Sequence, residues 1–372
     1  MKRYTNNICL LLSILLCFFY TMLGNNLLFI GGVLFAIPGI IGLFKTSCIW
    51  FIYFAVLIFI GGLMDMLTTS YGIGSSVIFL INCGITYAAL NNLKLFFNIS
   101  FILCLGLIIF LYKQMFVLGT VNGDIFLQYG LSKNYPGSLL VIFNCLWAVW
   151  KSLHYQKMPL ILPILSTIMC FFLDGRSSLI CMVLITVYCF IFRGKGWFFV
   201  MAILALGLLS YYWSDLSDLF ELTSLASRGL ETSRSDIWAE YFQGLDFSSF
   251  IFGLDTQNLP ELSSVDGNPH NSFLSLHRSM GLLGIATYLY YLVSVFKILL
   301  RRKQYTILFM IVVLHLRMFF DGMLTTAEDF FIYTLMFLVL CSDYPQFKIK
   351  EQLQNHDNSW YARWYDKLIS FV

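Results

Sequence analysis

The chain has 372 residues, of which 59% are hydrophobic and only 12% are charged, and its mean hydropathy is +0.79. Because soluble domains carry about 25% charged residues, this composition excludes an ordinary soluble protein and predicts one that crosses a membrane several times. The net charge of +3, without a long basic tract, argues against a nucleic-acid partner. The ten cysteines lie in or beside apolar runs, which is unlike a disulfide framework or a zinc site.

Apolar segments of spanning length recur along almost the whole chain. A transmembrane helix needs about 20 apolar residues, within a range of roughly 17 to 25. We therefore expect an all-α polytopic membrane protein with about 12 transmembrane helices, the first of which is an uncleaved N-terminal span. The expected spans are residues 8–23, 27–44, 47–64, 74–92, 95–116, 137–153, 158–173, 177–193, 197–213, 273–299, 304–320 and 329–343.

The distribution of lysine and arginine predicts the orientation of these spans. With both termini inside, sixteen of the 23 cations face the cytoplasm, as the positive-inside rule requires. Most of the remaining outer cations are arginines, which bind phosphate in a bidentate way that lysine cannot reproduce. Outer arginines kept against the usual charge bias predict an anionic ligand on that face. They are Arg176, Arg228, Arg234, Arg278 and Arg317.

The sequence is interpreted as a single membrane domain over residues 1–372. One long polar loop, at about 214–271, interrupts the apolar segments and is expected outside. The tail, residues 344–372, is expected in the cytoplasm. Within it, residues 358–372 carry tryptophans at helical spacing, which predicts an amphipathic helix at the membrane interface.

Two outer segments place an arginine where it could bind an anion. Asp174 and Arg176 belong to a tight turn, in which they either pair with each other or leave Arg176 to bind a ligand. Arg234 begins an expected helix whose free N-terminal amides would favour a bound phosphate, capped by Ser233 or Ser235.

The alternative interpretation of Arg234 is an ion pair with a neighbouring carboxylate such as Asp236, and Arg228 is close enough in sequence to assist Arg234. In the same expected helix, Trp238 would lie at the membrane interface. Three residues would form an apolar stripe of this helix, namely Ile237, Tyr241 and Phe242.

His270 and Asn271 precede the long span 273–299. Because histidine suits proton transfer near neutral pH, His270 at the mouth of a cavity is a candidate general base. His277 lies two helical turns further on and would share a face with His270 if the helix begins near Asn271.

Arg317 and Asp321 end the span 304–320 and are interpreted either as a structural pair or as part of a site. The sequence contains no Asp-x-Asp and no Cys/His zinc spacing. We therefore expect no metal and no other cofactor, so that arginine would supply the positive charge.

Six short motifs follow one another between residues 130 and 340. In their order and spacing they resemble those of the O-antigen polymerase and O-antigen ligase superfamily, multi-spanning glycosyltransferases of the bacterial inner membrane, and the resemblance implies a GT-C-like fold. The motifs are Asn-Tyr-Pro-Gly-Ser (134–138), Asp-Gly-Arg-Ser-Ser (174–178), Arg-Ser-Asp-Ile-Trp (234–238), Phe-Gly (252–253), Pro-His-Asn-Ser-Phe (269–273) and Gly281.

The resemblance implies a metal-independent enzyme that polymerises polyprenyl-pyrophosphate-linked saccharide units into O-antigen or a related surface polysaccharide, with its active site facing the periplasm. The catalytic residues would be Arg176 and Arg234, which hold the pyrophosphate, and His270, which takes the acceptor proton or orients the sugar. Its partners would be the lipid-linked donor and acceptor, membrane lipid and a chain-length regulator protein. The substrate-binding residues would be Asp174, Arg228, Trp238, Asn271, His277, Arg317 and Asp321.

Two alternatives remain open beside this Wzy-like polymerase. An O-antigen ligase would transfer the same glycan to lipid A-core. A flippase for the lipid-linked saccharide would also need outer cations, although alternating access usually brings polar residues to both faces and often involves repeated halves.

Overall fold

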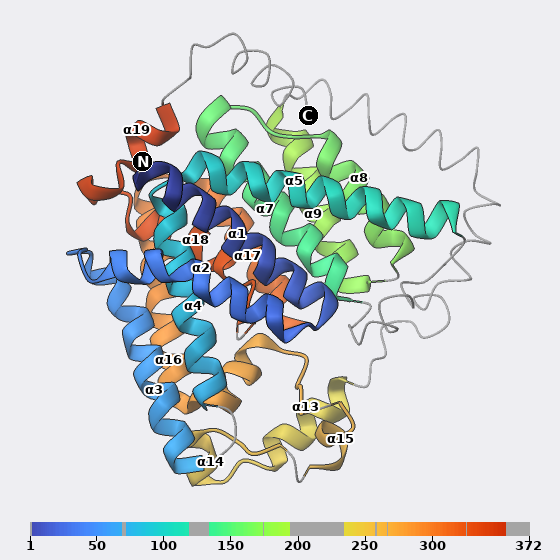
Figure 1. Ribbon diagram of the computed structural model, residues 1–372. Coiled ribbons are helices and arrows are strands. Elements are labelled where there is room, and N and C mark those ends of the chain that lie inside the picture. The colour runs from blue at the N-terminus through green and yellow to red at the C-terminus, as the bar shows by residue number, and fades with distance from the viewer. Residues whose placement is uncertain are drawn as a thin grey trace, which may run out of the picture. The chain divides into compact units, whose positions relative to one another are not determined.

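The computed structural model describes residues 2–68, 72–118, 134–173, 175–193, 234–256, 259–265, 267–324 and 326–354 (Figure 1). Across these ranges the chain is helical and forms no strand, which confirms the all-α class. Six of the described helices are long and apolar enough to cross a membrane. They are α1 (Lys2–Leu23), α2 (Asn26–Leu43), α5 (Leu93–Tyr112) with the π-turn η2 (Lys113–Val117), α7 (Tyr135–Tyr155), α9 (Arg176–Arg193) and α16 (Ser272–Arg301).

Five further apolar helices in the described ranges are shorter. Helices thus occupy eleven of the twelve predicted spans, and the remaining one, 197–213, lies outside the described residues. The apolar helices support a membrane protein, and the count of twelve spans stays a prediction. The shorter helices are η1 (Ile49–Phe51) continuing into α3 (Ile52–Thr68), α4 (Gly72–Leu90), α8 (Ile161–Phe172), α17 (Tyr305–Phe319) and α18 (Phe330–Leu340).

The predicted polar loop contains three short helices among its described residues. They are α13 (Arg234–Gln243), α14 (Phe247–Phe252) and α15 (Pro260–Ser263). After α18 come η3 (Pro345–Phe347) and α19 (Ile349–Gln354), and the predicted tail helix at 358–372 lies outside the described residues.

The chain divides into two compact units. The first comprises residues 1–99 and 233–354, and the second comprises residues 100–232 and 355–372. The first unit therefore contains α13 to α15 together with the helix that follows them, whereas α7, α8 and α9 belong to the second.

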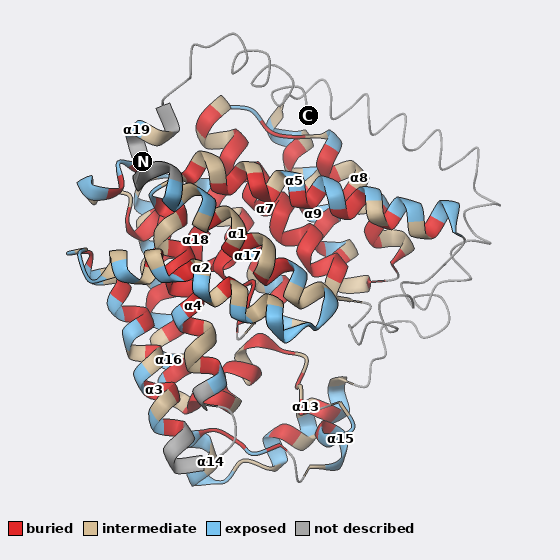
Figure 2. Ribbon diagram, in the orientation of Figure 1, coloured by how far each residue is buried: buried red, intermediate tan, exposed pale blue. Residues whose placement is uncertain are grey.

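The core of the first unit surrounds α18, all eleven residues of which are buried (Figure 2). Its Phe337 lies 4.9 Å from Phe51 and 5.1 Å from Phe54, measured between ring centroids. At its start, Asn82 of α4 accepts a hydrogen bond from the Phe330 amide and donates one to the Thr326 carbonyl. Aromatic packing along the helix and an amide bridge at its N-terminus thus fix α18 against its neighbours.

The outer surface of α2 is apolar, in contrast to the surface of a soluble protein. Leu27 and Phe44, at its two ends, are 75% and 88% exposed, and Leu34 and Ile41 between them are also exposed. An exposed apolar face of this extent agrees with a helix that borders lipid.

In the second unit α7 is buried along nearly its whole length and packs against α8 and α9. Asn144 of α7 donates a hydrogen bond to Ser166 of α8 at 2.8 Å. Gly137 lies so close to Ser178 of α9 that a Cβ at residue 137 would overlap the serine side chain. Glycine is therefore required where the start of α7 meets the start of α9.

In the first unit α16 is interrupted at Gly281, which has a φ of +60°. A Cβ there would overlap the Ile251 carbonyl at the end of α14, and a Cβ at Gly253, where φ is +98°, would overlap the Arg278 carbonyl. Two glycines thus let α14 pack against the backbone of α16 at the break.

Gly281→Ala is expected to lower the free energy of unfolding by about 1 to 3 kcal/mol from the positive φ alone, and the clash with α14 adds to that cost. The matched control is Gly62→Ala in α3, where a Cβ would meet nothing within 4 Å. Thermal unfolding in detergent measures both variants. Equal midpoints for the two would contradict the close contact between α14 and α16.

Candidate functional site

Helices α13 and α15 share a small core with Leu254, which follows α14. Ile237 and Tyr241 of α13 are buried against Leu254 and against Leu262 of α15. The predicted apolar stripe is correct for Ile237 and Tyr241 but wrong for Phe242, which is 59% exposed. The physical reason is that α13 buries a narrow face in this core and leaves its other side uncovered.

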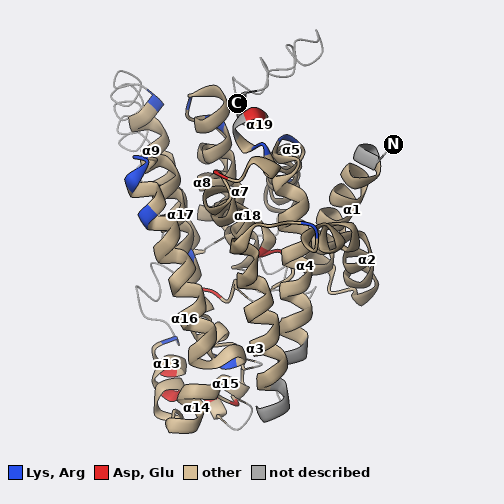
Figure 3. Cartoon of the chain, turned by 90° about the vertical axis from the view of Figure 1, so that its left-hand side faces the viewer, with Lys and Arg blue, Asp and Glu red and all other residues tan. Residues whose placement is uncertain are grey.

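Acidic residues of α13 lie near the N-terminal half of α16, and basic residues lie near both of its ends (Figure 3). Asp236 and Glu240 lie on α13, which bonds to the N-terminal half of α16, whereas Lys297 and Arg301 lie near the C-terminal end of α16. Arg234 of α13 and Arg278 of α16 also lie at the N-terminal end, so the orientation in the membrane stays a prediction.

His277 fastens α13 and α14 to α16. Its Nε2 lies 2.9 Å from the Phe250 carbonyl and its Nδ1 lies 2.8 Å from the Tyr241 hydroxyl. Because a carbonyl only accepts, Nε2–H donates to Phe250, and the neutral ring then accepts from Tyr241 at Nδ1. The side chain is buried, so both ring nitrogens are occupied by groups of the protein itself.

Trp238 joins α13 to two other segments. Its indole Nε1–H donates to the Pro269 carbonyl at 2.8 Å, and its ring meets Phe319, at the end of α17, edge to face at 5.3 Å. Trp238 therefore fixes α13 beside both the start of α16 and the end of α17.

His270 has a left-handed backbone, with a φ of +50°. Its amide donates to the side-chain oxygen of Asn268 at 2.9 Å, and the next residue, Asn271, caps α16 by accepting from the Phe273 and Leu274 amides. The helix begins at Ser272, so His270 lies before it and does not share a helical face with His277. A left-handed conformation is uncommon for residues other than glycine.

Arg317 and Asp321 form an ion pair at the end of α17. The guanidinium lies 2.7 Å from the carboxylate, and the arginine side chain is fully buried. The Asp321 carbonyl accepts from the Ser272 hydroxyl, which itself accepts from the Met323 amide. These bonds join the segment after α17 to the first turn of α16.

Arg234 and Asp321 both act electrostatically on His270. Burial lowers the pKa of His270 below its usual 6.5, the positive charge of Arg234 lowers it further, and the carboxylate of Asp321 raises it. The net effect is a lowered pKa, which favours the neutral imidazole. The structure thus brings together three charged or titratable groups, from α13, from the segment before α16 and from the segment after α17.

The other predicted residues lie elsewhere. Arg176 is the first residue of α9 and belongs to the second unit, so its predicted meeting with Arg234 and His270 stays a prediction. Asp174, Arg228 and Ser233 lie outside the described residues.

Two residues that shape this region, Asn268 and Ser272, received no role from the sequence, although Ser272 belongs to the motif 269–273. Asn268 forms the turn that precedes His270, and Ser272 bonds to the segment after α17. The sequence Asn-Pro at 268–269 is a turn signal that could have identified the first. The second depends on a contact between residues 49 positions apart, for which the sequence gives no local signal.

Among the residues that the structure describes, no three His, Cys, Asp or Glu side chains gather in a way that could hold a metal ion. Comparison of the chain with protein-family models, with curated proteins and with solved structures finds no match.

Proposed function

We propose that the protein is a glycosyltransferase that polymerises polyprenyl-pyrophosphate-linked saccharide units at the outer face of the inner membrane. The observation that carries the proposal is the meeting of the three segments that hold Arg234, His270 and the Arg317–Asp321 pair. Hydrogen bonds from Trp238 to Pro269 and from Ser272 to Asp321 join these segments. Transfer of a sugar from a pyrophosphate needs a base for the acceptor hydroxyl and a cation for the departing pyrophosphate. This arrangement offers both.

In the proposed reaction, the acceptor hydroxyl oxygen forms a bond to the anomeric carbon of the donor sugar, and the bond from that carbon to the pyrophosphate oxygen breaks. His270 receives the hydroxyl proton, and polyprenyl pyrophosphate leaves with the bonding electrons. Arg234 stabilises the charge that develops on the leaving group. Asp321, oriented by Arg317, stabilises the imidazolium that His270 becomes.

The positions of the motifs within each unit also support the proposal. Short matches that arise by chance have no reason to meet in space, yet these motifs pack in pairs. The pairs are 134–138 with 174–178 through Gly137 and Ser178, 234–238 with 269–273 through Trp238 and Pro269, and 252–253 with Gly281 through the junction of α14 and α16.

Purified protein in lipid nanodiscs, given a lipid-linked repeat unit and no energy source, tests the function. We expect the glycan on the polyprenyl carrier to grow. A parallel reaction contains lipid A-core as the acceptor, and a liposome assay follows transport. Transfer to lipid A-core alone would show a ligase, and transport without new glycosidic bonds would show a flippase.

Arg234→Lys is expected to reduce turnover at least about tenfold, because removing one well-placed donor to a developing oxyanion costs about 3 to 4 kcal/mol and lysine restores only part of it. The matched control is Arg302→Lys beyond the far end of α16, where the arginine pairs with the exposed Asp343. If Arg234→Lys retains the activity of the control, bidentate recognition of phosphate at this position is wrong.

A further inference from the structure

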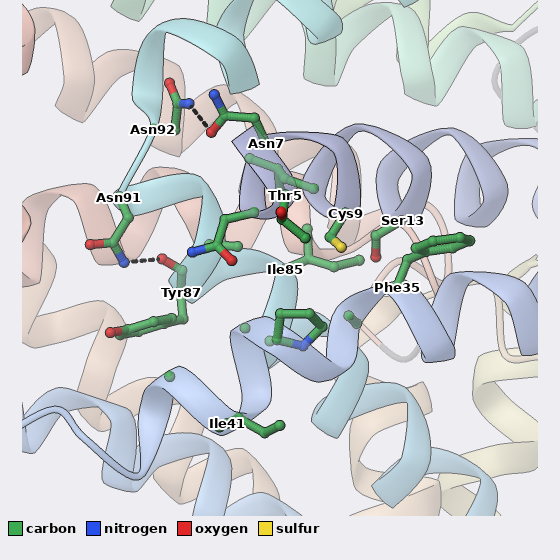
Figure 4. A pocket seen from close by; sticks show the side chains of 18 of the residues that line it. Thr5, Asn7, Cys9, Ser13, Phe35, Ile41, Ile85, Tyr87, Asn91 and Asn92 are labelled. Carbon is green, nitrogen blue, oxygen red and sulfur yellow. Dashed lines mark hydrogen bonds between the residues drawn. The ribbon is translucent and has the colours of Figure 1, made fainter. Parts of the chain in front are cut away.

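A pocket of about 780 Å³ lies between α1, α2 and α4 of the first unit (Figure 4). Its volume falls within the roughly 300 to 1,000 Å³ of pockets that bind small molecules. None of the residues assigned above to sugar transfer lines it. The pocket therefore needs an explanation of its own.

Close helix packing forms the walls of this pocket. A Cβ at Gly39 of α2 would overlap the Gly84 carbonyl of α4, and one at Gly42 would overlap the ring of Tyr87. On the other side, the Ser13 hydroxyl of α1 donates to the Gly32 carbonyl of α2 at 3.1 Å. The three helices are thus in firm contact, and the space between them is bounded by the backbone of α2.

The pocket has a polar end and an apolar end. Its polar lining comes from the first turns of α1, with Asn6 and Asn7, and from the residues that follow α2 and α4, with Lys45 and Asn91. Apolar residues such as Leu10 and Ile85 line the part closer to the middle of the helices. A lining of this kind fits an amphiphile better than a soluble ion.

The polar end offers hydrogen-bond donors and a positive charge. The Asn7 side-chain oxygen accepts from Asn92 at 2.7 Å, which turns the Asn7 amide nitrogen toward other partners (Figure 4). The exposed Lys45 lines the same pocket, and no carboxylate occurs among the residues described as lining it. Amide donors and a lysine without a neighbouring acid favour an anionic group such as a phosphate.

We propose that this pocket binds an anionic phospholipid, with the phosphate beside Lys45 and Asn6 and an acyl chain along Leu10 and Ile85. The exposed apolar face of α2 gives a lipid access from the side. By the distribution of lysine and arginine, the polar end lies at the cytoplasmic leaflet, which is rich in anionic lipids.

Native mass spectrometry of the full chain tests the proposal, with phosphatidylglycerol and phosphatidylcholine of identical acyl chains added to detergent-purified protein. We expect one phosphatidylglycerol to be retained about fivefold more than phosphatidylcholine, as one lysine beside an anionic headgroup allows. Lys45→Gln should abolish this preference. Lys297→Gln, which removes another exposed cation near the same predicted membrane face, should leave it unchanged.

Two further measurements distinguish a phospholipid bound in the pocket from inorganic phosphate bound there and from lipid bound non-specifically to the protein surface. Ala88→Phe, which fills the pocket, should reduce retention of both lipids, and Lys45→Gln decides the case if that variant does not fold. Inorganic phosphate should leave bound phosphatidylglycerol in place. Displacement by phosphate, or equal retention of the two lipids by the unmodified protein, would overturn the proposal.

Discussion

Asp321→Asn is expected to lower the free energy of unfolding by about 3 to 5 kcal/mol, since breaking a buried ion pair from one side leaves the remaining charge in a medium of low polarity. Arg317 is fully buried and lies 2.7 Å from this carboxylate. Asparagine retains the shape but not the charge. Thermal unfolding in detergent, followed by circular dichroism, measures the change.

The matched control is Asp343→Asn, which removes an exposed carboxylate from Arg302 and should cost no more than about 1 kcal/mol. A second comparison combines Asp321→Asn with Arg317→Met. This double variant removes both charges and should recover part of the lost stability. If Asp321→Asn and Asp343→Asn unfold at the same temperature, the buried ion pair contributes no more to stability than the exposed pair does.

His270→Ala is expected to reduce the rate of sugar transfer by about 10² to 10⁴, the range typical of removing a general base. Because alanine is disfavoured at a φ of +50°, a second variant, His270→Asn, is needed. Asparagine tolerates the left-handed backbone but takes up no proton. Both variants should lose turnover, and normal turnover in His270→Asn would exclude proton transfer by this residue.

The pH dependence of the rate is a second readout of the same prediction. The pKa of His270 lies below 6.5, so the rate should rise with pH and the midpoint of the rise should lie below pH 6.5. The carboxylate of Asp321 raises this pKa and Arg234 lowers it, so Asp321→Asn should move the rising limb to lower pH and Arg234→Gln should move it to higher pH. The depressed pKa also stabilises the fold above pH 6.5, and this contribution should be lost as the pH falls toward the folded-state value.

Helix positions could be predicted because apolar composition is a local property of the sequence. The span predicted at 137–153 appears as α7, and that at 273–299 appears as α16. The outer helices were harder to predict, because their buried faces are defined by one another. Phe242 continues the apolar stripe of α13 in sequence but has no partner in the small core that buries Tyr241.

The sequence could predict only the part of the candidate site that depends on residue type. Residue type identified His270 and Arg234, whereas their surroundings depend on contacts between distant segments. His277 illustrates the difference, because its partner Phe250 precedes it by 27 residues and reaches it only when α14 folds back onto α16. No spacing rule within one helix contains that information.

The fully buried helix α18 is too short to enter a membrane without other helices around it. Its eleven residues extend about 16 Å, roughly half of the 30 Å hydrocarbon core of a bilayer. A helix this short cannot cross lipid alone, and the amide bridge from Asn82 exists only once α4 is present. Stable insertion of α18 therefore depends on helices made before it, and a chain from which α4 is deleted would leave α18 without the Asn82 bridge.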